Sequence, residues 1–440
     1  MNNIDLLLHA RWLVTVDNDN RVLEQHCLAI KADKIIDILP SADAATRYKA
    51  KHEQHFDQHV LMPGLINSHT HAAMNLMRGI ADDLPLMEWL EKHIWPTEAK
   101  WVNSEFVSDG TRLAIAEMLR GGTTCFNDMY FCPDEVARVA IDTGIRASIG
   151  LIVIDFPTVW ANNADEYISK GLQVHEQVRD NPLITTAFAP HAPYTVSDEP
   201  LKKLNTLAEQ MDIPIHMHIH ETAGEVDSAV KDKGKRPLDR LQELGLLSPR
   251  LLAVHMTQLT DEDIDKIRTS GSHVLHCPES NLKLASGFCP VQKLLDAGIN
   301  VCIGTDGAAS NNDLDMFGEL RTAAMLAKGV SGDPCSVDAP TALRMATINA
   351  AKALGIDEIT GSLEIGKAAD IIAIDMNHIE TQPLFEPVSQ IVYSTGRHQV
   401  SDVWVAGKQL LRERNLTSLN EAELLATAKK WGDKIMSSNE

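Results

Sequence analysis

Short apolar runs alternate with amphipathic stretches through the middle of this 440-residue chain, and the alternation predicts its secondary structure. Apolar runs rich in β-branched residues are typical of buried strands, whereas apolar positions spaced by three and four residues are typical of helices. We expect eight strands, at residues 64–68, 123–127, 146–154, 184–189, 215–220, 251–255, 272–276 and 300–304. We expect helices between them at residues 107–120, 134–143, 165–179, 199–211, 261–270 and 290–297.

Strands joined by helices in this number predict an α/β fold, a (β/α)8 barrel of the TIM type. The alternative is a doubly wound parallel sheet that binds a dinucleotide. No glycine-rich phosphate loop follows the first strand, which disfavours that alternative.

The two chain ends have a different pattern, in which short strand-like segments are separated by polar turns. They lie at residues 4–9, 12–16, 27–31 and 34–39, and again at 370–375, 387–393 and 400–411. We therefore expect a small β-sandwich domain built from residues 1–60 and 362–415, with the barrel, residues 61–361, inserted between its halves. A late helix is expected at 341–354, and an amphipathic helix at 421–437 within a C-terminal segment, 416–440.

The composition excludes several classes of protein. A formal net charge of -21 would repel a nucleic-acid backbone, so no nucleic-acid partner is expected. No stretch approaches the about 20 consecutive apolar residues of a membrane span, and the N-terminus lacks a secretion signal. The seven cysteines are scattered without a Cys-x-x-Cys pair, which predicts reduced, mostly buried thiols. Together these features indicate a cytoplasmic protein without a membrane partner.

An apolar run from Leu61 to Ser68 ends in two histidines, His69 and His71. Side chains alternate along a strand, so these two imidazoles share one face and can hold one divalent cation. Taken alone the pair is a weak signal, because two polar residues at a strand end are common.

Titratable residues recur at the C-terminal tips of the expected strands, where a barrel assembles its active site. They are His69 and His71, His191, the group His216, His218, His220 and Glu221, then His255, His276 and Asp306. One such histidine means little, but their repetition on most of the eight strands predicts a metal-dependent active site.

These motifs resemble those of the amidohydrolase superfamily over nearly the whole chain. The resemblance is carried by Pro-Gly-Leu-Ile-Asn-Ser-His-Thr-His71, His218-Ile-His-Glu221, Val254-His255, His276-Cys-Pro-Glu-Ser-Asn281, Gly304-Thr-Asp306 and Gly361-Ser-Leu-Glu-Ile-Gly-Lys-Ala-Ala-Asp370. Together they are a strong signal, although no single one of them is.

The resemblance and the ligand chemistry imply one Zn²⁺ per subunit, held by His69, His71, His218 and Asp306. Fe²⁺ or Mn²⁺ suits the same donors. Alternation along the fifth strand cannot choose among its three histidines, but the family pattern pairs the ligand with Glu221, which selects His218. The roles of His216, His220 and His276 stay open. Residues 184–190 contain no lysine of the kind that bridges two metals in other members, so a single metal is expected.

Such a cation would lower the pKa of a water molecule and prepare it to attack an sp² carbon with a leaving group. Glu221 is expected to protonate the ring nitrogen of the substrate. Asp306 would accept the proton of the water, and His255 would orient the nucleophile and stabilise the intermediate. Glu221 has an alternative role as a carboxylate stabilised by a helix N-terminus, which is compatible with catalysis.

Residues 78–90, followed by Trp95-Pro-Thr-Glu98, resemble a loop of the 5′-methylthioadenosine and S-adenosylhomocysteine deaminase family. The resemblance implies that Trp89 lines the pocket, that Glu98 accepts hydrogen bonds from the ribose hydroxyls, and that His191 helps Glu221 to hold the nucleoside. The alternatives are a core aromatic for Trp89 and a solvated surface residue for Glu98.

Relatives that use S-adenosylhomocysteine place arginines just after the third strand, but residues 151–163 contain neither Arg nor Lys. Arg146 is interpreted as structural, whereas Phe156, Val159 and Trp160 offer apolar surface. An unpaired substrate carboxylate there would cost on the order of several kcal/mol. The sequence therefore predicts 5′-methylthioadenosine as the main substrate, with S-adenosylhomocysteine or adenosine weaker.

Two other functions remain open at this point. A triazine hydrolase or a free-base deaminase of the guanine type would have the same fold but no ribose, so it would not need Glu98. A non-catalytic metal-binding barrel is the more remote alternative. Barrels with long loops commonly associate, so a homo-oligomer, dimer or tetramer, is expected.

Overall fold

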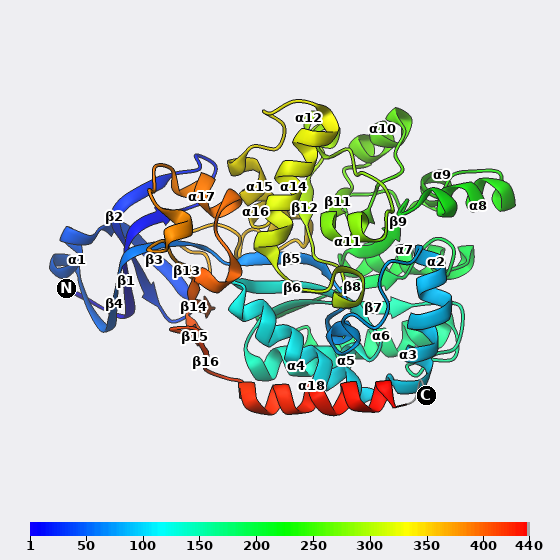
Figure 1. The fold of residues 1–440 in the computed structure, drawn as a ribbon, viewed down its shortest axis with the longest axis horizontal. Coiled ribbons are helices and arrows are strands. Elements are labelled where there is room, and N and C mark those ends of the chain that lie inside the picture. The colour runs from blue at the N-terminus through cyan, green and yellow to red at the C-terminus, as the bar shows by residue number, and fades with distance from the viewer. Residues whose placement is uncertain (438–440) are drawn as a thin grey trace.

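The computed structural model contains two eight-stranded sheets within residues 1–437, the residues that the structure describes. In Figure 1 the sheet built from the two chain ends, called the small sheet below, lies to the left, where blue and orange segments meet. The other sheet is the barrel sheet, which lies with its helices to the right.

The barrel sheet consists of parallel strands that follow one another in chain order. They are β5 (Leu65–Thr70), β6 (Thr123–Tyr130), β7 (Arg146–Val153), β8 (Ile184–Pro190), β9 (Ile215–Ile219), β10 (Leu251–His255), β11 (His273–His276) and β12 (Val301–Ile303). The backbone N–H of Asp306, just after β12, donates to the carbonyl of His69 on β5 at 2.9 Å. The N–H of Thr305 donates to the side chain of Asn67 at 3.0 Å. The last strand thus meets the first, which confirms the (β/α)8 barrel over the doubly wound sheet.

Helices cover the outside of the barrel and fill its connections (Figure 1). Along the chain these elements are η1 (Ala72–Met77), α2 (Leu86–Trp89), η2 (Leu90–Ile94), α3 (Trp95–Trp101), α4 (Ser104–Arg120), α5 (Pro133–Thr143), α6 (Ala164–Val178), α7 (Asp198–Met211), α8 (Ala223–Lys233), α9 (Pro237–Glu243), α10 (Asp261–Ser270), α11 (Pro278–Lys283), α12 (Val291–Asp296), α13 (Ala308–Asn311), α14 (Met316–Ser331), α15 (Ala339–Met345) and α16 (Ile348–Ala353). Asn103, Asn163 and Thr260 cap α4, α6 and α10 by accepting a backbone N–H, as N-terminal caps do. All six helices expected between barrel strands are confirmed.

The small sheet takes strands from both chain ends. They are β1 (Asn2–Val14), β2 (Val22–Lys31), β3 (Lys34–Pro40), β4 (Tyr48–Pro63), β13 (Ile371–Asp375), β14 (Val400–Val405), β15 (Lys408–Arg412) and β16 (Asn415–Leu416). The pair β1 and β4 is parallel, and the other pairs are antiparallel. Short helices α1 (Ser41–Arg47), η3 (Ile379–Thr381), α17 (Pro387–Tyr393) and η4 (Arg397–Gln399) complete this part of the chain. The expected small β unit from both ends is confirmed.

The division of the chain at residues 60/61 and 361/362 stays a prediction, and the first of these points falls inside β4. Of the expected C-terminal segment 416–440, residues 438–440 lie outside the described part of the chain.

Three expectations about secondary structure were wrong. Residues 387–393 form helix α17, because Glu386 caps its N-terminus, Pro387 fits the first turn, and Val388, Ile391 and Val392 bury one helical face. The single helix expected at 341–354 is two helices, broken at Thr347, whose φ and ψ are -136° and -100°. Strand β4 was missed, since the longer part of it, before Val60, carries mostly charged and polar side chains.

Two contacts join the sheets. Strand β4 runs directly into β5 through Gly64, where a Cβ atom would lie 2.0 Å from the hydroxyl of Thr124. Only glycine allows so close an approach. A buried ion pair joins Arg146 of β7 to Asp370, with its Nε 2.9 Å from Oδ2. Arg146 is therefore structural, as interpreted from the sequence.

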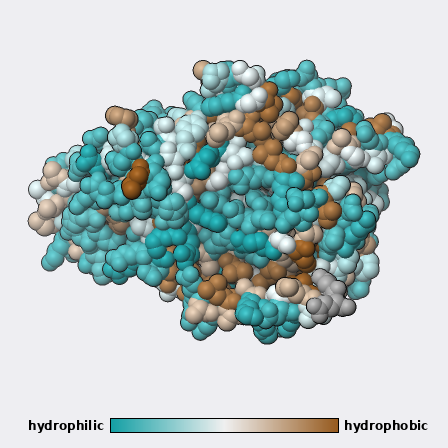
Figure 2. Space-filling model, viewed as in Figure 1, coloured by the Kyte–Doolittle hydropathy of each residue, from teal (hydrophilic) through white to brown (hydrophobic). Residues whose placement is uncertain are grey.

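The C-terminal helix α18 (Glu421–Met436) packs along the outside of the barrel beside α4 (Figure 1). Trp431 inserts next to Phe106, with ring centroids 5.2 Å apart, and its indole N–H donates to Asp109. On the face drawn in Figure 2 most of the surface is hydrophilic, and hydrophobic residues gather beside this helix.

None of the cysteines forms a disulfide, and all but Cys335 are buried. Within residues 1–437, no helix combines the length and the apolar composition needed to cross a membrane.

Candidate active site

A compact group of three imidazoles and one carboxylate lies at the C-terminal ends of the barrel strands. The Nε2 atoms of His69 and His71 lie 3.3 and 3.2 Å from Oδ1 of Asp306. The Nε2 atom of His218 lies 3.2 Å from that of His69. Candidate ligand atoms of all four residues fall within 4.8 Å of one another, so the structure brings together the predicted set.

The outer nitrogens of two of these rings bond to backbone carbonyls. Nδ1 of His71 lies 2.5 Å from the carbonyl oxygen of Met129, and Nδ1 of His218 lies 2.8 Å from that of His191. A carbonyl oxygen only accepts, so each Nδ1 must carry the hydrogen. The Nε2 lone pairs then point to the centre of the cluster, as a divalent cation requires. The donor set and its tautomers therefore fit a metal ion.

Asp306 is held in the left-handed region of the backbone, with φ of +63°. The hydroxyl of Ser280 donates to its Oδ2 at 2.7 Å, and the N–H of Gly307 donates to its Oδ1 at 2.8 Å. Although burial alone would raise it, the imidazoles of His69 and His71 beside the carboxylate hold the pKa of Asp306 well below its usual range. The carboxylate is thus fixed in its ionised form toward the histidines.

Glu221 and His255 face the same centre from the neighbouring strands. Nε2 of His255 lies 3.8 Å from Oε2 of Glu221 and 4.0 Å from Oδ2 of Asp306. His255 has φ of +72°, a conformation that costs energy in a non-glycine residue and is frequent at active sites. Burial raises the pKa of Glu221, although the neighbouring His255 opposes the shift. Glu221 therefore retains a proton more readily than an exposed glutamate.

The first turn of α11 supplies two contacts that were not predicted from the sequence. Ser280 bonds to Asp306 as described, and Oδ1 of Asn281 lies 2.9 Å from Nδ1 of His255. Consecutive residues thus orient both side chains. The signal was present in His276-Cys-Pro-Glu-Ser-Asn281, a polar motif directly after a barrel strand.

The three histidines left open lie outside the cluster. Nε2 of His216 lies 2.8 Å from Nδ1 of His69, on the outer side of that ring. His220 turns away and accepts the backbone N–H of Leu238 at 3.3 Å. His276 is buried at the tip of β11, and its Nδ1 has no hydrogen-bond partner within residues 1–437.

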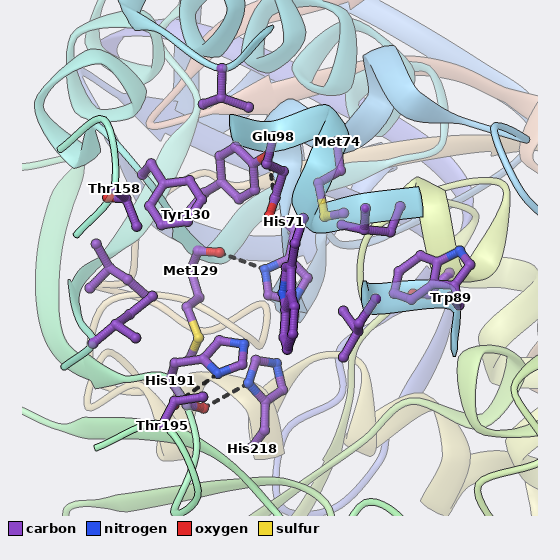
Figure 3. A pocket seen from close by; sticks show the side chains of 18 of the residues that line it. His71, Met74, Trp89, Glu98, Met129, Tyr130, Thr158, His191, Thr195 and His218 are labelled. Atoms are coloured by element: carbon purple, nitrogen blue, oxygen red, sulfur yellow. Dashed lines mark hydrogen bonds between the residues drawn. The ribbon is translucent and has the colours of Figure 1, made fainter. Parts of the chain in front are cut away.

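The cluster opens into a cavity of about 510 Å³, which is shown in Figure 3. Every predicted catalytic and substrate-binding residue lines it, as do three of the four candidate metal ligands. These lining residues are His71, His218, Asp306, Glu221, His255, Trp89, Glu98 and His191.

Glu98 lines this cavity with a partly buried carboxylate, rather than lying free in solvent as a surface residue. Its Oε1 accepts a hydrogen bond of 2.8 Å from the hydroxyl of Tyr130 (Figure 3). Burial raises the pKa of Glu98 to about 7, although Tyr130 and the charge of His71 lower it. Tyr130 directly follows Met129, whose carbonyl orients His71, so strand β6 supports both groups.

Trp89 and His191 border the cavity on different elements. The indole N–H of Trp89, at the end of α2, donates to the carbonyl of Ala81 at 3.2 Å, which leaves the ring face on the cavity side. Nδ1 of His191 lies 3.1 Å from the hydroxyl of Thr195, and its ring lies beside that of His218 (Figure 3).

Apolar and aromatic side chains make up most of the remaining wall, and no Arg or Lys of residues 1–437 lines it. Phe156 and Val159, both largely exposed, lie at the opening as expected. Trp160 does not line the cavity, because its ring lies beside the ammonium group of Lys170 at 5.3 Å.

Known proteins resemble this chain over its full length. A family profile described as "Amidohydrolase family" matches residues 60–410. A protein of Teredinibacter turnerae named 5-methylthioadenosine/S-adenosylhomocysteine deaminase is 50% identical over 432 residues, 98% of each chain. A solved adenosine deaminase of Xanthomonas campestris, described with bound zinc, is 52% identical with a TM-score of 0.98 over 99% of each chain. A zinc complex of an Arthrobacter aurescens atrazine chlorohydrolase has a TM-score of 0.90 over 97% of this chain and 99% of its own, but at 23% identity it shows the fold alone.

Proposed function

The chain belongs to the amidohydrolase family and is a hydrolase that acts on carbon–nitrogen bonds, and on this premise we propose that it deaminates a 5′-substituted adenosine. The preferred substrate is 5′-methylthioadenosine, which would give 5′-methylthioinosine and ammonia. S-Adenosylhomocysteine and adenosine are weaker substrates. The observation that carries this proposal is that one cavity opens onto the histidine–aspartate cluster and is lined by Glu221 and by the carboxylate of Glu98. The names of the most similar relatives support it.

The cluster would hold one Zn²⁺ per subunit through His69, His71, His218 and Asp306, and Fe²⁺ or Mn²⁺ suits the same donors. A bound divalent cation supplies an acidified water molecule as the nucleophile. Strand β8 contains no lysine to bridge a second ion, which favours a single metal.

The residues around the cluster would move the protons. Glu221, with its raised pKa, donates a proton to the ring nitrogen of the adenine so that ammonia can leave. Asp306 accepts the proton of the attacking water and passes it to the amino group, so that a C–O bond forms, the C–N bond breaks and the amino group leaves as ammonia. Glu221 regains its proton from the new hydroxyl group, which becomes the carbonyl of the product. His255, oriented by Asn281, stabilises the charge that develops at the attacked carbon.

Glu98 would bind the ribose. Within residues 1–437 its recorded side-chain hydrogen bond is the one from Tyr130 to Oε1, so Oε2 can accept from the ribose hydroxyls. Trp89 covers the nucleoside with its ring, and His191 contacts it beside the metal ligands. A triazine or a free base has no ribose and would leave this carboxylate in the cavity unused, so neither alternative is favoured.

The wall of the cavity bears on the 5′ substituent. S-Adenosylhomocysteine carries a carboxylate on its tail, and the wall offers it no cationic side chain among the described residues. An unpaired charge in such surroundings costs several kcal/mol, on the order of 3 or more. The methylthio group instead suits Phe156 and Val159.

The test follows the loss of adenine absorbance with a panel of 5′-substituted adenosines, with the metal content measured on the same sample. We expect kcat/KM for 5′-methylthioadenosine to exceed that for S-adenosylhomocysteine by at least about tenfold, equal to about 1.4 kcal/mol. A higher value for S-adenosylhomocysteine would contradict the substrate assignment. Metal-replete protein that releases no ammonia from any of these nucleosides would contradict the function itself.

We further propose that the protein acts in the cytoplasm as a homo-oligomer, a dimer or a tetramer. Light scattering on the purified protein measures its mass in solution, and a monomer at micromolar concentration would be the contrary result.

A further inference from the structure

A second group of metal-ligating side chains lies on the small sheet, away from the barrel. Within residues 1–437 only one other group besides the active-site cluster has ligand atoms within 4.8 Å of one another, and it consists of His9, Glu53 and His55. The strands that carry it, β1 and β4, are drawn in blue at the left of Figure 1.

The parallel register of β1 and β4 places these side chains on one face of the sheet. His9 pairs with His55, and Leu7 pairs with Glu53, so residues 53 and 55 share the face of residue 9. His52 belongs to the opposite face, because it pairs with Leu6. The group is therefore produced by strand pairing and not by a flexible loop.

The distances suit a shared ion. Nε2 of His9 lies 2.9 Å from Oε1 of Glu53, and Nε2 of His55 lies 3.6 Å from the same oxygen. The two imidazole rings are stacked, with centroids 4.4 Å apart and planes 7° apart. Both Nε2 atoms thus lie on the same side, facing one carboxylate.

One of the three candidate ligands is held in place by its buried surroundings, whereas the other two are exposed and can adjust the position of their side chains. The side chain of His9 is 11% exposed, whereas those of Glu53 and His55 are 52% and 59% exposed. Burial and the nearby His55 lower the pKa of His9, although Glu53 and Asp57 oppose the shift, so the ring stays neutral and can donate its lone pair. The nearby carboxylate of Asp57 adds negative charge.

We propose that His9, Glu53 and His55 form a peripheral site for a divalent cation of the zinc class, distinct from the active site. Two imidazoles and a carboxylate are donors that Zn²⁺ prefers, with Asp57 or water in the remaining position. The ion would cross-link β1 to β4, the strand that continues into the barrel as β5. Its role is to fasten the N-terminal strand, and the inference does not depend on the substrate proposed above.

The test counts zinc in the whole protein after equilibration with Zn²⁺ and removal of free ion. We expect His55→Ala to carry one ion fewer per chain than the unsubstituted protein, and Glu53→Gln to bind more weakly. His52→Ala is the matched control, since it removes an exposed imidazole from the other face of the same strand, and we expect no loss. When the active-site cluster is already loaded with metal, further Zn²⁺ should raise the Tm of the control but not the Tm of His55→Ala.

Equal zinc counts in His55→Ala and the unsubstituted protein would overturn the proposal. So would an equal loss in His52→Ala, which would mean adventitious binding to surface histidines. Turnover measured on the same samples separates the two metal sites, because His55→Ala should keep full activity.

Discussion

At the scale of single residues, backbone carbonyls determine which nitrogen the candidate metal ligands offer. The carbonyls of Met129 and His191 take the Nδ1 hydrogens of His71 and His218. Since both carbonyls belong to neighbouring strands, the barrel itself sets the tautomers. The metal site is therefore a property of strand register as much as of residue type.

His69→Ala should abolish both metal retention and turnover. Its Nε2 lies within 3.3 Å of both His218 and Asp306, so its loss removes the central donor of the cluster. We expect kcat to fall by about a thousandfold or more, equal to about 4 kcal/mol in activation free energy. Metal analysis and kinetics on one preparation check this, with His52→Ala as the control. Full metal content and full activity in His69→Ala would show that the central assignment is wrong.

Glu98→Gln tests the ribose contact. An amide replaces a charged acceptor, and a hydrogen bond to a charged group contributes about 1.5–3 kcal/mol, so kcat/KM for a nucleoside should fall about 10- to 100-fold. The assay compares 5′-methylthioadenosine with a triazine. If the substitution leaves nucleoside turnover unchanged, Glu98 does not bind the ribose.

The raised pKa of Glu98, about 7, predicts a dependence of KM on pH. The carboxylate is ionised above that pH and accepts hydroxyl hydrogens best in that form. KM for the nucleoside should therefore rise as the pH falls from 8 to 6, roughly one pH unit either side of that pKa. Steady-state kinetics across this range check the trend. In Glu98→Gln the same segment of the profile should be flat.

Residue type, spacing and the family resemblance together predicted the clustered histidines and Asp306, but not their supporting contacts. Ser280 and Asn281 were quoted only as part of a motif, because short polar side chains have no chemistry that marks them in advance. Their roles depend on distances to Asp306 and His255 that only the folded chain defines.

At the scale of elements, the barrel strands were predictable because they are short runs rich in apolar residues, most of them with titratable residues at their ends. The elements that were predicted wrongly or missed are those whose hydrophobic pattern also fits a different structure. Helix α17 is a short apolar run that periodicity cannot separate from a strand, and Glu386 with Pro387 decides it. Strand β4 is polar on both faces over much of its length, so pairing with β1 and not its own pattern makes it a strand.

Trp431→Ala should destabilise the protein without changing its catalysis. The side chain is almost fully buried between α18 and α4, and its removal leaves a cavity and frees Asp109 from a hydrogen bond. The expected loss in the free energy of unfolding is about 3–5 kcal/mol, measured by urea denaturation. Leu425→Ala on the same helix is the control, since that side chain is 61% exposed. Equal effects of the two substitutions would contradict this packing.

At the scale of the whole molecule, the small sheet and the barrel are connected by the direct passage of strand β4 into β5 and by one buried ion pair. The sequence predicted the small sheet only in outline and missed strand β4. The connection of this sheet to the barrel nevertheless depends on specific residues. Gly64 permits the passage from β4 to β5, and Asp370 reaches Arg146 on β7.

Arg146→Met should be strongly destabilising. It leaves the carboxylate of Asp370 buried without its cation, which costs about 3–5 kcal/mol. The double variant Arg146→Met with Asp370→Asn should recover part of that loss, and urea denaturation of the unsubstituted protein, the two single variants and the double variant measures it. Additive losses in the double variant would show that the two side chains do not act as a pair.

The closing seam of the barrel has a further consequence. The N–H groups of Thr305 and Asp306 donate to Asn67 and His69, which joins the last strand of the barrel to the first. Asp306 and His69 are also candidate metal ligands, so the same few residues close the barrel and hold the candidate ion. Occupancy of the metal site and closure of the barrel are then one equilibrium. Amide hydrogen exchange at these two positions would report it, as a local opening that accelerates when the ion is withdrawn while the strands on the opposite side of the ring stay protected.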